Sequence, residues 1–144
     1  MLIPDSYVAD LQLRLGLYRR LSTLELRPDI DAFAAELVDR FGELPDEVRH
    51  LLDVVEIKGL AKQAGLQQLD AGPKGAVVAF RKNQFANPEG LVAFMQKSRG
   101  GVRMQPDHKL VFKADWDLPE ARLAGVRGLV RQLAEIAGQG KKAA

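Results

Sequence analysis

The stretch Leu37-Val38-Asp39-Arg40-Phe41-Gly42-Glu43-Leu44-Pro45 decides how the first half of this chain folds. Reading backwards from Phe41, apolar residues recur at the spacing of an amphipathic helix: Ile30, Phe33, Ala34, Leu37, Val38 and Phe41. Gly42 predicts the end of that helix, because glycine adopts the left-handed conformation of a helix cap without a Cβ clash. Pro45 predicts the start of the next helix, because proline is tolerated at the first helical position. The stretch is therefore a predicted junction between two packed helices.

The opposite face of the same helix is predicted to be exposed and acidic. It carries two acids three residues apart, Glu36 and Asp39, beside the small side chains of Ala32 and Ala35. Residues at i and i+3 share a helix face, so both carboxylates point the same way. A hard metal ion needs more oxygen ligands than two, and the sequence supplies no others. Glu36 and Asp39 are therefore the first candidates for an ion-pairing contact with a partner.

Two further helices are predicted in the first half, after an extended lead-in at residues 3–7 that contains Pro4. The first runs from about Val8 to Leu24 and has a wide apolar face, which we expect to be substantially buried. That face consists of Leu11, Leu13, Leu15, Leu17, Tyr18, Leu21 and Leu24. The other helix opens at Pro45 and stops at Gly65. The first half is thus predicted to be three helices joined by tight breaks.

After Gly65 the period changes to short, partly β-branched runs that are typical of strands. The predicted elements follow in the order strand 66–72, strand 76–80, helix from 88, strand 102–105, strand 109–113 and a helix from 119. The turn Gly72-Pro73-Lys74-Gly75 joins the first two strands, and Gly100-Gly101 closes the short helix. Residues 138–144 are predicted to be a small, basic, frayed tail.

These elements predict an α+β fold: an N-terminal three-helix segment, a small antiparallel sheet of two strand pairs with an intervening helix (ββαββ), and a C-terminal helix. A chain of 144 residues with 47% hydrophobic and 28% charged residues suits a single domain, 1–144, with an ordered core at about 3–137. The absence of cysteine excludes a disulfide framework, a thiolate metal site and a cysteine nucleophile. No apolar run reaches the length of a membrane span, and no signal peptide is recognisable, so we expect a cytoplasmic protein.

The net charge of +2 hides an asymmetry between the two halves. Residues 1–65 contain 8 Lys/Arg and 12 Asp/Glu, whereas residues 66–144 contain 13 and 7. The cations in and around the strands are Arg81, Lys82, Lys97, Arg99, Arg103, Lys109 and Lys113. Clustered positive charge attracts phosphate, so a nucleic-acid-binding module that uses this basic half is the alternative function. The aromatic residues lie where a core needs them, and no exposed stacking platform is recognisable.

The sequence gives little support for catalysis. His50 and His108 are the only histidines, and neither has a serine or an acid at an informative spacing. Neither glycine-rich phosphate-binding motif occurs, and hairpin geometry accounts for Gly72 and Gly75. We therefore expect a chain without catalytic residues, metal or cofactor.

Several motifs, in this order and spacing, resemble the C-terminal domain of bacterial transcription-repair coupling factors, the Mfd family. They are Ile3-Pro4-Asp5-x-Tyr7-Val8, then Arg14-Leu15-x-x-Tyr18-Arg19-Arg20, then Glu36 through Pro45, then Asn83-x-x-x-Asn87-Pro88. The resemblance covers roughly residues 3–137. It implies that the chain is a C-terminal fragment of a large ATP-dependent DNA translocase, in which ATP and Mg belong to the helicase part and not to this chain.

The resemblance also implies a regulatory role in DNA repair. In the family, the translocase displaces RNA polymerase stalled at DNA lesions and recruits UvrA for nucleotide excision repair. The C-terminal domain packs on the UvrA-binding module of the same protein, masks it, and restrains the translocase until RNA polymerase is engaged. The acidic pair that faces arginines of that module falls on Glu36 and Asp39, which are therefore the predicted interface residues. Phe41 and Gly42 are expected to maintain the fold.

Overall fold

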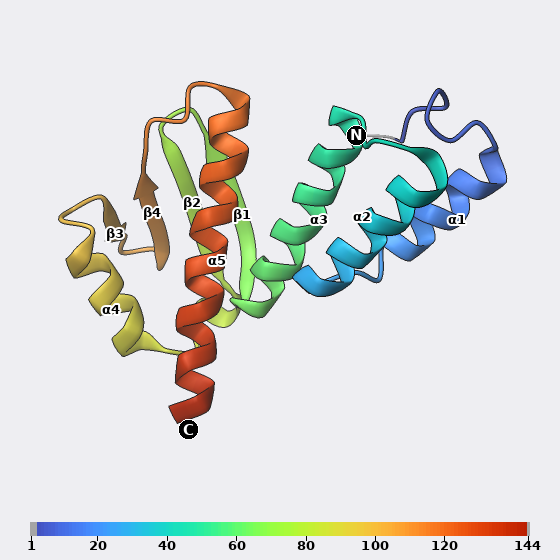
Figure 1. The fold of residues 1–144 in the computed structure, drawn as a ribbon. Coiled ribbons are helices and arrows are strands. Elements are labelled where there is room, and N and C mark those ends of the chain that lie inside the picture. Colours follow the sequence, from blue (N-terminus) through green and yellow to red (C-terminus); the bar gives the residue numbers. More distant parts are fainter. Residues whose placement is uncertain (1–2, 144) are drawn as a thin grey trace. The chain divides into compact units, whose positions relative to one another are not determined.

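The computed structural model describes residues 3–143, with side chains up to residue 140. These residues form five α-helices, a short 3-10 turn and one four-stranded antiparallel sheet, so the predicted α+β class and the order of its elements are confirmed (Figure 1). The bounds are α1 Leu11–Leu21, α2 Arg27–Phe41, α3 Asp46–Gln63, β1 Leu66–Gly72, β2 Gly75–Phe80, η1 Arg81–Asn83, α4 Pro88–Lys97, β3 Val102–Met104, β4 Lys109–Lys113 and α5 Pro119–Ala143.

Residue contacts divide the chain into two compact units, Met1–Gly59 and Leu60–Ala144, here called the first and the second unit. The boundary falls inside α3. Each unit has a buried apolar core, built around Phe33 and Leu37 in the first and around Leu110, Leu129 and Leu133 in the second. The single-domain organisation of residues 1–144 stays a prediction.

The first unit is helical, and its core confirms most of the predicted stripe on α2. Ile30, Phe33 and Leu37 are no more than 2% exposed. Gly42 ends the helix at a φ of 92°, and its N–H donates to the carbonyl of Val38 at 3.0 Å. A side chain with Cβ would be strained at this φ, which is why the helix ends at a glycine.

Two predictions of burial in the first unit were wrong. Leu11, Leu13 and Leu15 are 56%, 43% and 41% exposed, although we expected a wide buried face. α1 buries only Leu17 and Leu21, because a short helix has a limited face in contact with its neighbours. Val38 was also assigned to the core stripe but is 47% exposed, since it lies beside Asp39 at the edge of that stripe.

The lead-in to α1 is held by signature residues. The backbone N–H of Ile3 donates to the Tyr18 hydroxyl at 2.5 Å, and Arg14 donates to the carbonyl of Val8 at 2.7 Å. Asp10 caps the helix by accepting from the N–H of Gln12 at 2.8 Å. This cap starts α1 at Leu11, and the predicted start at Val8 was three residues too early.

In the second unit the two predicted hairpins join into one sheet with strand order β1-β2-β4-β3. β2 is central, and its Val78 pairs with Leu69 of β1 and Leu110 of β4. Val78 and Leu110 have no exposed surface. α5 runs across one face of this sheet (Figure 1), and Val126, Leu129, Val130 and Leu133 are its most buried residues in the middle of the helix.

α5 extends to Ala143, so the residues that were predicted to be a frayed tail, 138–144, are helical as far as they are described, and Ala144 lies outside the described residues. That the tail frays stays a prediction. Gly140 contributes to this extension, because a Cβ there would lie only 2.6 Å from Cβ of Asn87. The lack of a side chain lets the helix approach the segment before α4.

Candidate functional site

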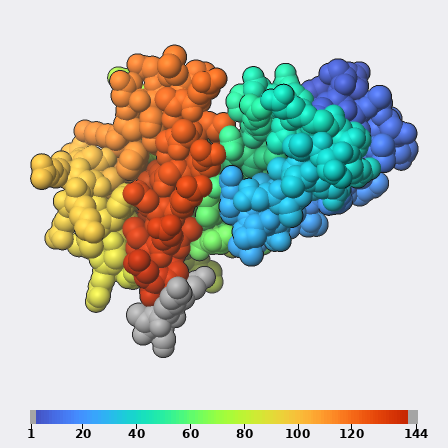
Figure 2. Space-filling model, viewed as in Figure 1, coloured from blue at the N-terminus to red at the C-terminus, as the bar shows by residue number. Residues whose placement is uncertain are grey.

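The predicted interface lies on α2, on the side away from the buried Phe33 and Leu37. Figure 2 shows this helix, in light blue to cyan, at the surface of the first unit. The Glu36 side chain is 37% exposed, and Asp39 is exposed. We call Glu36, Asp39, Arg20 and Arg40 the α2 surface, because the two arginines lie beside the predicted acids.

Glu36 is already paired within the first unit. Arg20 of α1 donates to both of its carboxylate oxygens, at 2.5 and 2.9 Å, in a bidentate arrangement. Arg40, one helical turn along α2, adds a hydrogen bond at 3.2 Å. Bidentate arginine–carboxylate pairs are the stronger and more directional kind of ion pair. Glu36 thus connects α2 to α1 through Arg20, a contact that could not be predicted from the sequence.

Both arginines are also fixed by aromatic rings. The guanidinium carbon of Arg20 lies 4.9 Å from the centre of the Phe33 ring, and that of Arg40 lies 4.9 Å from the centre of the Phe41 ring. Cation–π contact and ion pairing together restrict the arginine side chains. The guanidinium groups of Arg20 and Arg40, each packed on a ring, therefore orient the carboxylate of Glu36.

The electrostatics follow from this geometry. The hydrogen bonds from Arg20 and then from Arg40 lower the pKa of Glu36 from 4.5 to about 2. The same contact raises the pKa of Arg20 above its ordinary value, chiefly through its hydrogen bond to Glu36. Glu36 is consequently ionised throughout the neutral range, and its charge is balanced by its neighbours.

Asp39 differs from Glu36. It is exposed, and it forms no ion pair with any residue in the described part of the chain. An exposed carboxylate with free oxygens can accept a bidentate arginine from another surface. Of the two predicted residues, Asp39 is the one that offers an uncompensated charge.

Tyr7 fixes the helix end next to this surface. Its hydroxyl lies 2.7 Å from the carbonyl oxygen of Gly42 and 3.1 Å from that of Leu37. Its ring contacts Phe41, with 5.8 Å between ring centres. Burial raises the pKa of Tyr7, so the hydroxyl keeps its proton and donates to these carbonyls. Phe41 is partly buried at the edge of the core, in agreement with its predicted role in the fold.

A second ion pair in the first unit was missed from the sequence. Glu56 of α3 is 2% exposed and accepts a hydrogen bond from Arg27, which also contacts Asp31 at 3.0 Å. The hydrogen bond to Glu56 is the main cause that raises the pKa of Arg27. An acid inside the apolar run Val54-Val55-Glu56-Ile57 was the available signal, because buried charges require partners.

The remaining chemistry-bearing residues do not converge. His50 is partly buried on α3, and His108 is exposed in the turn between β3 and β4. Over the described residues, no group of three or more His, Cys, Asp or Glu side chains could hold a metal ion. Within the same part of the chain, no helix is long and apolar enough to cross a membrane.

On the sheet of the basic half, three of the predicted cations lie apart from the aromatic rings. Arg103 of β3 lies opposite Val111, and Lys109 and Lys113 flank Val111 on β4, so the three cations share one sheet face. Phe112 alternates to the other face, where it stacks on Trp116 at 5.6 Å between ring centres. No stacking platform accompanies the three cations, and the nucleic-acid alternative gains no support from this geometry.

Comparison with known proteins identifies the family. A family model described as the TRCF domain matches residues 1–91. The chain belongs to the TRCF domain family. The transcription-repair-coupling factor of Escherichia coli is 32% identical over 136 residues, which cover 94% of this chain and 12% of the relative. That of Rickettsia bellii is 41% identical over 110 residues, which cover 76% of this chain and 10% of the relative.

The TRCF assignment agrees with the fold. A crystal structure of the C-terminal domain of transcription-repair coupling factor matches with a TM-score of 0.78 at 22% identity, over 96% of this chain and 89% of that one. This chain spans about a tenth of the length of the relatives named above. The resemblance to transcription-repair coupling factors that the sequence motifs indicated is therefore confirmed.

Proposed function

We propose that this chain is a non-catalytic regulatory domain that uses the α2 surface to bind the UvrA-binding module of the same longer protein. In this role it masks the module and restrains ATP-dependent DNA translocation until RNA polymerase is engaged. The observation that carries the proposal is the exposed carboxylate of Asp39, which has no ion-pair partner among the described residues and lies one turn from Glu36. The partner group that suits it is an arginine.

In this proposal the two acids have different roles. Asp39 accepts the partner's arginine directly. Glu36 holds Arg20 and Arg40 in place and offers its remaining lone pairs to a second arginine at the edge of the contact. Replacement of Glu36 alone therefore affects the shape of the α2 surface as well as its charge.

A weak contact suits this proposed role. Exposed acid–arginine pairs contribute little, because water screens them and the side chains lose freedom. When both surfaces belong to one protein, the contact is intramolecular and a high effective concentration keeps it closed. A competing partner can then open it without having to overcome a strong interface.

The test is charge reversal of both acids, Glu36→Lys with Asp39→Lys, in the full-length protein. The matched control is Asp115→Lys with Asp117→Lys, two exposed acids of the second unit that form no ion pair with any described residue. Both double variants change the net charge equally. Pull-down of UvrA measures the masking, and ATP hydrolysis on DNA measures the restraint.

We expect the α2 variant to capture more UvrA and to hydrolyse ATP faster, whereas the control behaves as the unmodified protein. Circular dichroism of the isolated 144-residue chain shows whether the substituted domain still folds. If a well-folded α2 variant captured no more UvrA than the control does, the assignment of this interface would be wrong.

A further inference from the structure

One face of the sheet in the second unit presents apolar and positively charged side chains together. Paired residues of antiparallel strands project to the same face, so the register of the ladder places these side chains next to one another. One row across the four strands consists of Asp70, Val77, Val111 and Arg103. Lys109 and Lys113 lie two positions before and after Val111 on β4 and project to the same face. We call these six residues the open sheet face.

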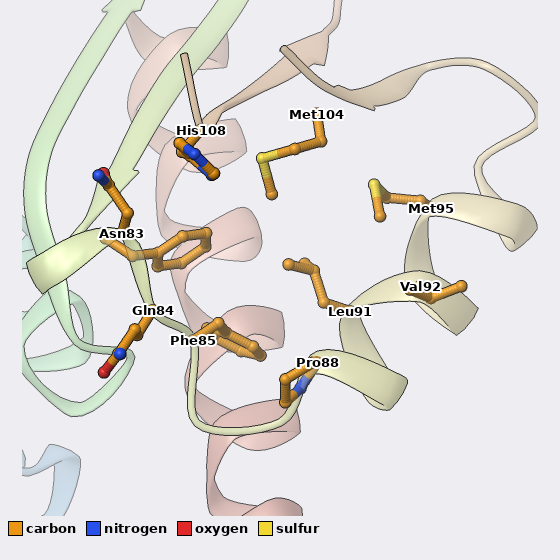
Figure 3. Close-up of a pocket in the computed structure, with 10 residues that line it drawn as sticks. Asn83, Gln84, Phe85, Pro88, Leu91, Val92, Met95, Met104 and His108 are labelled. Carbon is orange, nitrogen blue, oxygen red and sulfur yellow. The ribbon is translucent and has the colours of Figure 1, made fainter. Parts of the chain in front are cut away.

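The other face of the sheet is covered by helices. Val78 and Leu110 project to it and have no exposed surface, and α5 runs across it (Figure 1). α4 packs on the same side, because Figure 3 shows its Leu91 and Met95 directed toward the same space as Met104, which pairs with Leu110. These side chains border an apolar groove of about 580 Å³, and none of the described residues that line it is Lys, Arg, Asp or Glu. The two helices therefore lie on the side opposite to the open sheet face.

The open sheet face keeps apolar surface accessible. Val77 and Val111 are only partly buried. A hollow of about 520 Å³ is lined by both valines and by the turn between β1 and β2. In the next row of the ladder Gly75 pairs with Gly72 and with Lys113, so β1 and β2 contribute no side chain there. The hollow beside the valines can therefore accept an apolar side chain of a partner.

The apolar centre is flanked by cations. Arg103 lies opposite Val111 on β3, and Lys109 and Lys113 lie on either side of it along β4. Arg103 and Lys113 are exposed and Lys109 is partly buried. None of the three forms an ion pair within the part of the chain that the structure describes. Unpaired cations around an apolar centre are complementary to a partner that carries carboxylates beside an apolar side chain.

The acids near this face do not neutralise its cations. Asp70 lies on the edge strand β1, which β2 separates from β4, and it accepts a hydrogen bond from Gln68 at 2.7 Å. Asp107 precedes β4 and accepts a hydrogen bond from the backbone N–H of Lys109 at 3.1 Å. Asp115 follows β4. Since none of these acids forms an ion pair with a described residue, the cations of β3 and β4 remain available to carboxylates of a partner.

We propose that the open sheet face binds an acidic helix of a protein partner, with an aliphatic side chain on the two valines and carboxylates beside the lysines of β4. A helix suits this face because β2 and β4 are interior strands whose backbone groups already pair on both sides. An extended segment would find no backbone partner there, whereas a helix satisfies its own hydrogen bonds.

The spacing of the face also matches a helix. Side chains at i−4, i and i+4 of a helix lie about 6 Å apart, and alternate residues of a strand such as Lys109, Val111 and Lys113 lie roughly 6.7 Å apart. A helix with the order acid, aliphatic residue, acid at these positions can therefore meet all three. Nucleic acid would contact the cations through phosphate but would leave the valines without an apolar partner. The proposal does not depend on the α2 surface.

The test uses a labelled, alanine-based helical peptide with leucine at position i and glutamates at i−4 and i+4. A peptide of the same composition with both glutamates on the face opposite the leucine is the control ligand, and a labelled oligothymidylate represents nucleic acid. Fluorescence anisotropy on the 144-residue chain in about 50 mM salt measures affinity, and chemical-shift mapping by NMR locates the site. We expect the first peptide to bind more tightly than both other ligands, with shifts at Val77, Val111 and Lys113.

Two substitutions test the face itself. Lys113→Glu replaces an attractive charge by a repulsive one, and we expect affinity for the first peptide to fall about tenfold. Lys97→Glu is the matched control, because Lys97 is an exposed lysine of α4, on the other side of the sheet, and it should change affinity by less than about twofold. Val111→Thr keeps the branched shape and removes apolar surface, so affinity should fall about threefold.

The proposal is wrong if the control peptide binds as tightly as the first one, if the first one does not bind in about 50 mM salt, or if Lys97→Glu weakens binding as much as Lys113→Glu does. It is also wrong if the oligothymidylate alone shifts residues of the open sheet face. The comparison of the three ligands uses the unmodified chain, so a variant that fails to fold does not prevent the test.

Discussion

In the first unit Arg20, Arg27 and Arg40 each contact a carboxylate, whereas in the second unit Arg81 and Arg103 form no ion pair with any described residue. The first unit contains 7 Lys/Arg and 12 Asp/Glu, and the second contains 14 and 7. Where acids are in excess, Arg20 and Arg27 connect different helices, and Arg40 pairs within its own helix. In the second unit, where cations are in excess, Arg81 and Arg103 are exposed without an ion pair among the described residues, and the small net charge of the chain conceals this difference.

The largest change in stability is expected at Asn87 of the second unit. There a neutral amide joins two segments, as Arg20 and Arg27 do in the first unit. Its side chain accepts from the N–H of Gly90 and donates to the carbonyl of Ile136, both at 3.0 Å. Asn87→Ala removes a helix cap and a cross-helix bond, and should destabilise the chain by about 2 kcal/mol in urea unfolding. Gln84→Ala, at an exposed residue nearby, should change stability by less than about 0.5 kcal/mol.

The second prediction compares the same change, arginine to methionine, in the first and the second unit. Arg27→Met removes a partner of the buried Glu56, and we expect a loss of about 1.5 kcal/mol, since hydrogen bonds to charged groups are stronger than neutral ones and Arg27 is half exposed. Arg103→Met should change the free energy of unfolding by less than about 0.5 kcal/mol. If chemical denaturation showed the same loss of unfolding free energy for both variants, the paired arginine of the first unit would contribute no more to stability than the unpaired one of the second.

A smaller effect is expected at Tyr7, where a neutral group connects the lead-in to the end of α2. Tyr7→Phe keeps the ring contact with Phe41 and removes the hydroxyl that lies 2.7 Å from the carbonyl of Gly42. We expect a loss of about 1 kcal/mol, measured by thermal unfolding. Tyr7→Leu should lose more, because it also removes the aromatic contact. If Tyr7→Phe were as stable as the unmodified chain, the hydroxyl would contribute nothing.

The smallest effect concerns the pH dependence of the pair at Glu36. Its pKa is about 2 in the folded chain and near 4.5 when unperturbed, so the stabilisation is complete above the higher value and is lost as pH falls through about 2. Carbon-detected NMR of the Glu36 carboxyl should show this low midpoint. Arg20→Gln should raise the midpoint, whereas Arg103→Gln should leave it unchanged. If Arg20→Gln left the titration midpoint of Glu36 unchanged, the hydrogen-bonded pair of Arg20 and Glu36 would be contradicted.

The sequence predicted those features that depend on neighbours a few residues apart. Gly42 as a helix end, the Gly72–Gly75 turn and Asn87 before Pro88 are local signals, and each appears where it was expected. The α2 stripe was correct for Ile30 and Leu37 and wrong for Val38, because periodicity defines the centre of a buried face better than its edge. Periodicity likewise could not show that α1 leaves Leu11 and Leu15 uncovered.

Of the candidate site, the position of two acids on one helix face could be predicted from the sequence, but not which of them is paired with an arginine. Glu36 bonds to Arg20, sixteen positions away, and Glu56 bonds to Arg27, twenty-nine positions away. No spacing rule connects residues on different helices. The difference between a compensated Glu36 and an available Asp39 came chiefly from the packing of α1 on α2, with a weaker hydrogen bond from Arg40 on α2 itself.

By itself the sequence determined the α+β class, the order of the elements, the helix caps at Gly42 and Asn87 and the family, because all of these depend on local patterns and ordered motifs. The tertiary structure decided that the two hairpins join through β2 and β4, that α5 continues past Gly138, and that an apolar groove forms beside α4. Each of these depends on contacts between segments far apart in the chain. Their free energy comes from burial and pairing that only the folded chain brings together.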